Sequence, residues 1–305
     1  MEMFVFQGQD STSLQAYLWQ PEGEVKAVLQ ITHGMTEHMG RYEKFAEDMC
    51  RQGIAVAGFD LRGHGKNPGD AQVATFGEGG WAASIADMRL FFEVLRQKFP
   101  ETPHYMYGFS LGSFLLREYL NQYPNGVAGA IIVGTGYQPG WLLNIMMGIV
   151  KGQIKKAGFD QTTELVKQLS FGAYNQKFKP NRTSADWLCA DEAELDRYLA
   201  DPLVRPNISA GLFWELLGSM KRTGNLAAYK NWHKEMPVML EYGEHDPVGD
   251  AGKGVQKVYD HMKKAGLTNV VFTGCFDARH DLLHEEAGGA AEMLRHDVAD
   301  FVDGR

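Results

Sequence analysis

The sequence predicts an α/β fold with a mostly parallel central sheet, flanked by helices and interrupted by one helical insertion. Short apolar runs, each suited to a strand buried on both faces, alternate with longer segments of helical periodicity. Residues 136–236 break this alternation, since they are helical in character and show no clear strand. A chain of 305 residues is long enough for one large α/β domain with such an insertion.

The strands of the predicted core are short apolar runs that end in polar or glycine-containing turns. They are expected over residues 3–7, 13–19, 27–32, 54–59, 104–107, 127–133, 237–242 and 269–273. Gly8-Gln9-Asp10 is a hairpin signal, so the first two strands are expected to be antiparallel. The later strands are mostly separated by helical segments, which favours parallel pairing.

The helices of the core carry apolar side chains at helical spacing, and several end at glycine or proline. They are expected over residues 41–52, 81–99, 114–123, 253–265 and 285–302. The core therefore comprises residues 1–135 and 237–305, and residues 136–236 are interpreted as a helical cap or lid inserted between two strands.

Composition is that of an ordinary globular protein, with 44% hydrophobic and 22% charged residues. The formal net charge of −8 argues against a general nucleic-acid binder, which needs a basic face. Three widely spaced cysteines without a CxxC pattern favour a cytoplasmic compartment, where thiols stay reduced. We expect no signal peptide, and the longest apolar stretch, 141–150, is too short to span a bilayer.

Residues 107–112, Tyr-Gly-Phe-Ser-Leu-Gly, lie between a predicted strand and a predicted helix. A Gly-x-Ser-x-Gly turn in this position can hold its serine in a strained conformation, with the hydroxyl exposed above the sheet. The flanking glycines let the strand and the helix approach closely. The pattern is weak alone, but its strand–turn–helix context makes Ser110 a candidate nucleophile.

A serine nucleophile needs a base, and the base needs an acid that holds its tautomer. In α/β-hydrolases the chain order is Ser, then Asp or Glu, then His. Here Ser110 is followed by Asp246 and His280, each just beyond a predicted strand. Ligands bind at the carboxyl ends of strands in open α/β sheets. We therefore predict an α/β-hydrolase fold in which these three residues form the catalytic triad.

Other residues of the same two loops could replace the acid or the base. These alternatives are Asp250, His245, His284, Asp277 and Asp281. Asp250 lies further from the strand end than Asp246. Neighbours of His280 in the chain rarely present a carboxylate correctly to its imidazole, which disfavours Asp277 and Asp281. The ordered set on three strand ends favours Ser110, Asp246 and His280.

His33-Gly34-Met35 follows an earlier predicted strand. In this fold one oxyanion-hole N–H comes from such a loop, and the other comes from the residue after the nucleophile. We therefore assign the backbone N–H groups of Met35 and Leu111 to the oxyanion hole. His33 is expected to support the loop by hydrogen bonds. The spacing of the nearby histidines matches no common zinc pattern, so neither a metal nor a cofactor is expected.

Four stretches carry a family resemblance, namely residues 33–42, 60–65, 242–248 and 278–285. They resemble the HG-x-x-EH-x-x-RY stretch, the D-x-RGHG turn, the acid loop and the histidine loop of monoacylglycerol lipases and lysophospholipase-like hydrolases. This branch is often grouped under the serine aminopeptidase name. The resemblance covers residues 10–135 and 237–303. The chain departs from the family at Phe109, where a His is frequent, and at Ser113 and Lys66.

The resemblance implies a serine hydrolase that cleaves carboxylic esters through an acyl-enzyme. Its small-molecule substrate would be a monoacylglycerol, a lysophospholipid or a similar medium-to-long acyl ester. An aminopeptidase or amidase on the same triad, and a non-catalytic binding protein on this fold, remain alternatives. An aminopeptidase would need a carboxylate for the free amino terminus, and the candidates in the cap are Asp186, Asp191, Glu192 and Glu194.

The cap begins with a dense apolar stretch, 141–150, which is followed by Lys151, Lys155 and Lys156. The favoured interpretation is that these apolar residues bury the cap against the core. A second interpretation is an acyl-chain wall in which flexible methionines accommodate different chains. A third is an amphipathic lid with basic flanks that makes transient contact with a membrane surface.

Overall fold

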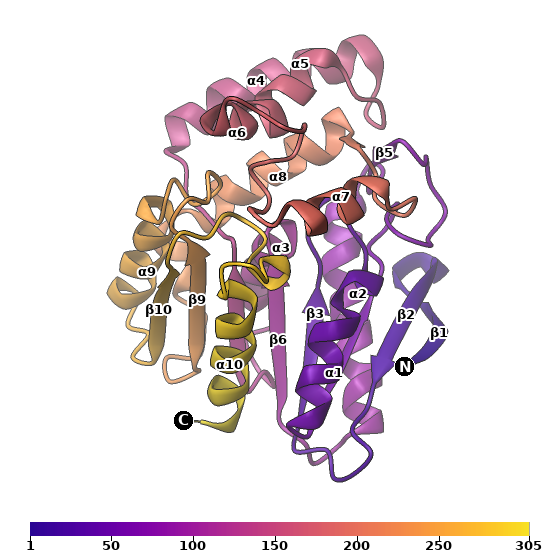
Figure 1. The fold of residues 1–305 in the computed structure, drawn as a ribbon, viewed down its shortest axis with the longest axis vertical. Coiled ribbons are helices and arrows are strands. Elements are labelled where there is room, and N and C mark those ends of the chain that lie inside the picture. The colour runs from indigo at the N-terminus through magenta and orange to yellow at the C-terminus, as the bar shows by residue number, and fades with distance from the viewer. Residues whose placement is uncertain (305) are drawn as a thin grey trace.

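A computed structural model describes residues 1–304, and its central sheet has eight strands in the order β1-β2-β4-β3-β6-β7-β9-β10 (Figure 1). The hairpin of β1 and β2 and the pair of β2 and β4 are antiparallel, and the other pairs are parallel. This sheet confirms the predicted fold class. The strands are β1 (Glu2–Gln7), β2 (Ser13–Trp19), β3 (Ala27–Thr32), β4 (Ile54–Phe59), β6 (His104–Phe109), β7 (Gly129–Val133), β9 (Val238–Gly243) and β10 (Val270–Cys275).

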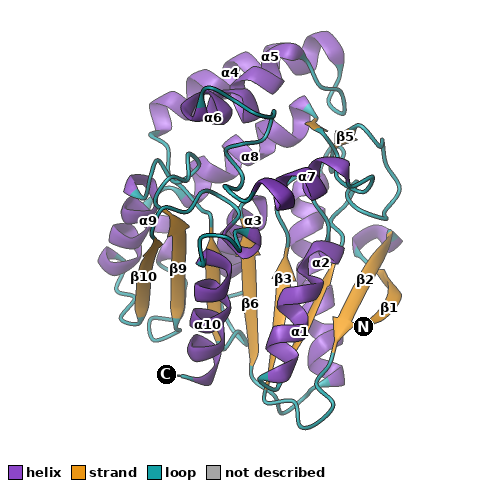
Figure 2. Cartoon of the chain, viewed as in Figure 1, coloured by secondary structure: helices purple, strands orange, loops and turns teal. Residues whose placement is uncertain are grey.

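Helices cover both faces of this sheet (Figure 2), which explains why its strands are continuous apolar runs. One face carries α1 (Glu43–Arg51) and α10 (Ala290–Asp303). The other face carries α2 (Gly80–Lys98), α3 (Leu111–Gln122) and α9 (Lys253–Lys264). Val28 and Leu29 are neighbours in β3 yet pack into opposite layers, because side chains alternate along a strand.

The last helix begins later than residue 285, where the sequence predicted its start. Residues Leu282–His284 form a single 3-10 turn, and α10 begins only after Gly289, whose φ of 76° suits glycine. Glu285 instead accepts hydrogen bonds from the N–H groups of Arg279 (2.9 Å) and Ala190 (3.2 Å). The side chain therefore holds a loop together rather than starting a helix.

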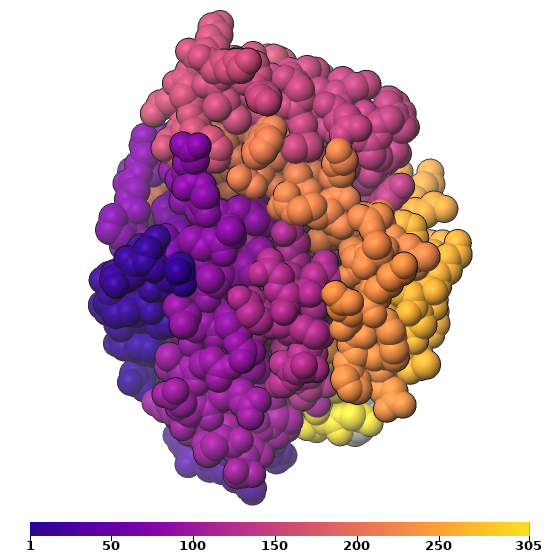
Figure 3. Space-filling view, turned by 180° about the vertical axis from the view of Figure 1, so that it is seen from behind, coloured from indigo at the N-terminus to yellow at the C-terminus, as the bar shows by residue number. Residues whose placement is uncertain are grey.

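Residues between β7 and β9 form a helical layer at one end of the sheet (Figure 1), and the same layer covers the top of the molecule seen from behind (Figure 3). Its helices are α4 (Gly140–Ala157), α5 (Glu164–Lys167), α6 (Ala173–Asn175), α7 (Glu192–Ala200) and α8 (Ala210–Thr223). The layer also holds a two-residue strand, β8 (Asn207–Ile208), paired with β5 (Val73–Ala74). The expectation of no strand was wrong here, because two residues carry no periodic signal. No helix within residues 1–304 has the length and apolarity needed to cross a membrane.

Arg117, a buried residue of α3, holds both ends of this helical layer. Its guanidinium donates to the Thr135 hydroxyl (3.0 Å) and the Gly136 carbonyl (3.1 Å), where the layer begins. It also donates to the Thr223 carbonyl (2.9 Å) and the Tyr229 hydroxyl (2.6 Å), near where the layer ends. The helix that follows Ser110 therefore fixes the layer at both of its connections to the core.

Candidate active site

Ser110 lies in a sharp turn between β6 and α3, with φ of 50° and ψ of −115°. A positive φ is unusual for a residue with a side chain and marks a strained backbone. The Ser110 N–H donates to the Val133 carbonyl (3.0 Å), which anchors the turn to β7. A Cβ on Gly112 would lie 2.0 Å from the Thr32 carbonyl oxygen, so only glycine lets α3 approach β3 this closely.

His280 and Asp246 meet at the ends of β9 and β10. Nδ1 of His280 lies 2.9 Å from Oδ1 of Asp246, and both side chains are buried. The Val248 N–H donates to the same carboxylate oxygen at 2.8 Å, which orients the carboxylate. The Nδ1 contact is within ion-pair distance but lacks hydrogen-bond geometry, and Nε2 of His280 has no hydrogen-bond partner among the described residues. The arrangement leaves Nε2 free to accept a proton, with a carboxylate on the opposite side of the ring.

Ser110 and His280 line one cavity of about 810 Å³, and Met35 lines it as well. The structure records no direct hydrogen bond from the Ser110 hydroxyl to His280, and such contacts are often long before a substrate binds. Asp246 lies behind His280 and does not line this cavity. The residues predicted as nucleophile, base and acid therefore come together in one region.

The alternative acids and bases have other partners. Nε2 of His245 lies 2.9 Å from Asp277 at the surface, and Nδ1 of His284 lies 2.8 Å from Asp281. Asp250 is exposed, with its carboxylate 3.8 Å from Lys177. None of these five residues lines the cavity that contains Ser110.

Of the two residues predicted to supply oxyanion donors, Met35 lines the cavity that contains Ser110, and Leu111 follows Ser110 in the chain. Neither the Met35 nor the Leu111 backbone N–H donates to another described residue. Nδ1 of His33 donates to the Gly34 carbonyl (2.7 Å), and Nε2 accepts the Leu61 N–H (2.9 Å). Because the peptide is planar, fixing the Gly34 carbonyl also fixes the direction of the Met35 N–H. Burial lowers the pKa of His33 to about 3, so the ring stays neutral and keeps these two bonds.

Two aromatic rings beside His280 were not assigned a role from the sequence. The ring centroids of Phe109 and Trp187 each lie 5.0 Å from that of His280. Phe109 is noticeable in the sequence only as a departure from the family pattern. Trp187 belongs to the helical layer, and no sequence signal could indicate that it reaches a loop some ninety positions later in the chain.

Residues 185–205, which we call the inner segment, are bound to the histidine loop. The Asp281 N–H donates to the Leu188 carbonyl at 2.7 Å. The Arg279 guanidinium donates to the Cys189 carbonyl at 3.1 Å and also to the carbonyl of the adjoining Asp186. Both neighbours of His280 therefore bind the inner segment.

The inner segment is also bound to the loop that carries Met35. The Arg205 N–H donates to the Thr36 carbonyl (2.8 Å), and the Thr36 and Tyr198 hydroxyls lie 2.8 Å apart. Nε2 of His38 lies 2.8 Å from an Asp201 carboxylate oxygen. The two loops predicted to hold the base and an oxyanion donor therefore share one partner.

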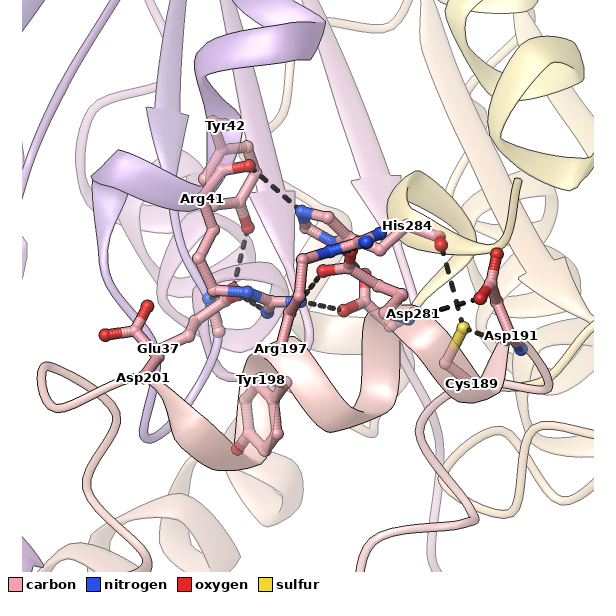
Figure 4. A network of polar contacts seen from close by, with 12 residues as sticks. Glu37, Arg41, Tyr42, Cys189, Asp191, Arg197, Tyr198, Asp201, Asp281 and His284 are labelled. Carbon is pink, nitrogen blue, oxygen red and sulfur yellow. Dashed lines mark hydrogen bonds and ion pairs between the residues drawn. The ribbon is translucent and has the colours of Figure 1, made fainter. Parts of the chain in front are cut away.

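A buried ionic cluster joins these three segments (Figure 4). The Arg41 guanidinium pairs with Glu37, with Asp281 at 2.9 Å and with Glu194 of α7 at 3.4 Å. Burial opposes ionisation of Asp281, but the charges of His284 and Arg41 outweigh it and hold its pKa well below the usual range. Asp281 in turn raises the pKa of His284, although burial and Arg41 act in the opposite direction.

The cavity offers no free carboxylate among the described residues. Asp201 is the acidic side chain in its wall, and it pairs with His38. Asp186 accepts hydrogen bonds from the N–H groups of residues 182 and 183, and Asp191 caps α7. Within residues 1–304 no cluster of three or more His, Cys, Asp or Glu side chains could hold a metal ion.

Comparisons with known proteins point to one family. A model of the family described as serine aminopeptidase, S33, matches residues 23–287. The monoglyceride lipase of Rattus norvegicus is 22% identical over 288 residues, which cover 94% of this chain and 86% of that protein.

Solved structures agree over nearly the whole chain. A thermostable carboxyl esterase from Bacillus coagulans, in complex with glycerol, has a TM-score of 0.87 at 20% identity, covering 99% of this chain and 98% of that one. A soluble variant of the Saccharomyces cerevisiae monoglyceride lipase, in complex with a substrate analog, has a TM-score of 0.78 at 19% identity, covering 99% and 95%. At these identities the likeness concerns the fold, and it confirms the predicted α/β-hydrolase fold.

Proposed function

The chain belongs to the serine aminopeptidase (S33) family of hydrolases, as its motifs predicted, and we propose that it cleaves carboxylic esters through an acyl-enzyme on Ser110. The observation that carries this proposal is the meeting of three strand ends. Ser110 and His280 line one cavity, and Asp246 lies 2.9 Å behind His280. A serine hydrolase acting on esters also agrees with the relatives, which are lipases and esterases.

The proposed reaction has two steps. The Ser110 oxygen attacks the ester carbonyl while its proton passes to Nε2 of His280, which then gives the proton to the leaving alcohol. Water attacks the acyl-enzyme in the second step, again with His280 as base. Asp246 holds the imidazole, and the N–H groups of Met35 and Leu111 stabilise the oxyanion. Loss of one such donor typically costs about 3 kcal/mol of transition-state stabilisation.

The proposed substrate is a monoacylglycerol, a lysophospholipid or a similar medium-to-long acyl ester. The cavity wall supports an acyl chain, because many of its side chains are apolar. They include Met35, Phe109, Phe171, Trp187, Leu188, Leu199, Val204 and Ile208. An aminopeptidase is disfavoured, because the carboxylates that could hold a free amino terminus are engaged elsewhere or lie outside the cavity.

We also propose that residues 136–236 act as the cap of this enzyme and that α4 contacts a lipid surface. Trp141, Ile145 and Ile149 are 66%, 54% and 40% exposed, and basic residues 151, 155 and 156 follow them on the same helix. An exposed apolar face with basic flanks suits an interface helix.

The cysteines at 50, 189 and 275 are free thiols, in keeping with the proposed cytoplasmic compartment.

A fluorophosphonate probe tests the reaction type. The native protein is expected to be labelled, and Ser110→Ala is expected to be unlabelled and inactive. Equal labelling of the two proteins, or none of either, would show that Ser110 is not an activated nucleophile and would favour the binding-protein alternative. A chain-length series of p-nitrophenyl esters measured beside aminoacyl anilides then separates esterase from aminopeptidase activity.

A further inference from the structure

Two aromatic rings from distant parts of the chain lie close to the imidazole of His280. Phe109 at the end of β6 and Trp187 in the inner segment each have their centroid 5.0 Å from the imidazole centroid. Their planes are tilted from the imidazole by 38° and 34°. At this separation and tilt the rings are neither edge-on nor coplanar side by side, so each turns part of its face towards the imidazole.

The fold itself holds Trp187 in this position. Residues 186, 188 and 189 are hydrogen-bonded to residues 279 and 281, so the neighbours of the tryptophan bind the neighbours of the histidine. The Trp187 ring also stacks on Phe171 with centroids 5.6 Å apart and planes tilted by 23°. Trp187 is 5% exposed, so little water reaches the contact.

Charge gives this contact a chemical consequence. His280 becomes a cation whenever it accepts a proton, first from Ser110 and then from the attacking water. The face of an indole ring attracts a cation within about 6 Å of its centroid, and it does so more strongly than a phenyl ring. Neutral imidazole gains much less from the same face. The attraction is therefore stronger in the transition state than in the ground state, and it raises kcat rather than lowering KM.

We propose that Trp187 is a positioning residue that stabilises the protonated form of His280 from the side of the inner segment, while Phe109 packs against the same imidazole from the end of β6. This inference rests on the proposed function, since it needs His280 to be the general base. It makes the inner segment part of the catalytic machinery and not merely a cover over it.

Fluorinated tryptophan tests the proposal, because fluorine withdraws electron density from the ring face with little change in shape. The protein is produced with tryptophan, 5-fluorotryptophan or difluorotryptophan, and kcat and KM are measured with p-nitrophenyl butyrate. We expect kcat to fall stepwise, by about three- to tenfold in total, with KM unchanged. The matched control is Trp187→Phe, produced in the same media. This variant keeps the other tryptophans of the six in the sequence, and these still carry fluorine. Its kcat is expected to be the same with and without fluorine.

Each outcome bears on a different claim. An unchanged kcat in the fluorinated wild type would overturn the role of Trp187 and leave the proposed function intact. A fall in kcat that also occurs in fluorinated Trp187→Phe would assign the effect to another tryptophan. That result would also overturn the proposed role of Trp187. Failure of the proposed function is seen separately, as full esterase activity in Ser110→Ala. Trp187→Leu, which fills the site without a π face, is expected to lose about tenfold in kcat.

Discussion

The helical layer contains two parts that differ in how they meet the core. The inner segment, residues 185–205, is bound by hydrogen bonds and ion pairs to both loops predicted to carry catalytic groups. The outer segment, residues 140–167, packs mainly on α8 and leaves apolar side chains of α4 exposed. The difference indicates that the layer is no uniform lid. The inner segment contacts the loops of the candidate site, whereas α4 of the outer segment leaves apolar side chains exposed at the surface.

The largest effect is expected where the inner segment meets the histidine loop. Asp281→Asn removes a buried charge that pairs with Arg41 and His284. Breaking one partner of a buried ion pair typically costs about 3–5 kcal/mol of unfolding free energy. Urea unfolding at pH 6 measures this cost. The matched control is Asp196→Asn in the inner segment, whose carboxylate is exposed and pairs with Arg182 at the surface. A similar loss of unfolding free energy in both variants would contradict the conclusion that the buried contacts of the histidine loop matter more than the exposed ion pairs of the inner segment.

The pH dependence of that cost tests its electrostatic origin. The pKa of Asp281 is lowered on folding, so its contribution is present above its unfolded value of about 3.9 and is lost as pH falls towards the folded value. The pKa of His284 is raised, so its contribution is present below about 6.5 and is lost as pH rises through the folded value. The difference between wild type and Asp281→Asn should be largest between about pH 4 and 6.5. A cost that is independent of pH would point to packing instead.

A smaller but catalytic effect is expected at Arg279. Arg279→Met keeps an unbranched stem at this position but removes the donors to the Asp186 and Cys189 carbonyls. His280 and the inner segment would then be aligned less well, and misplacement of a catalytic group by about 1 Å can cost about 100-fold in rate. We expect kcat for a soluble ester to fall by about 10- to 100-fold on this basis. Arg182→Met, which removes exposed contacts with Glu192 and Asp196 of the inner segment and none with the histidine loop, should retain the wild-type kcat.

The sequence was sufficient for those features that local patterns specify. Strands buried on both faces are continuous apolar runs, so β3 and β4 begin and end where the sequence predicted. Ser110, Asp246 and His280 could be proposed because this fold places its chemistry at strand ends in a fixed chain order. The start of α10 was predicted too early, because the tertiary bonds of Glu285 override its helix propensity.

Contacts between distant segments could not be read from the sequence. Trp187 had no visible role until the fold brought it to His280. The burial of Arg117 was equally hidden, because its partners are mostly backbone carbonyls and hydroxyls, which leave no complementary charge in the sequence. The division of the helical layer into inner and outer segments follows from such contacts, which the helical character of the sequence in this region does not reveal.

The smallest effect is expected in the outer segment. Replacing both Trp141 and Ile145 with Ser removes exposed apolar area and leaves the core intact. The free energy of unfolding should therefore change little, and the rate of hydrolysis of a soluble acetyl ester should change by less than about twofold. Hydrolysis of a long-chain ester held in vesicles should fall by about three- to tenfold, because the apolar side chains that would enter the interface are lost. Sedimentation with the same vesicles measures binding directly. Ser substitution at Met3 and Val5, which are exposed on β1 away from the helical layer, is the matched control. An equal loss in that variant would show that the effect comes from general surface apolarity and that α4 has no special contact with lipid.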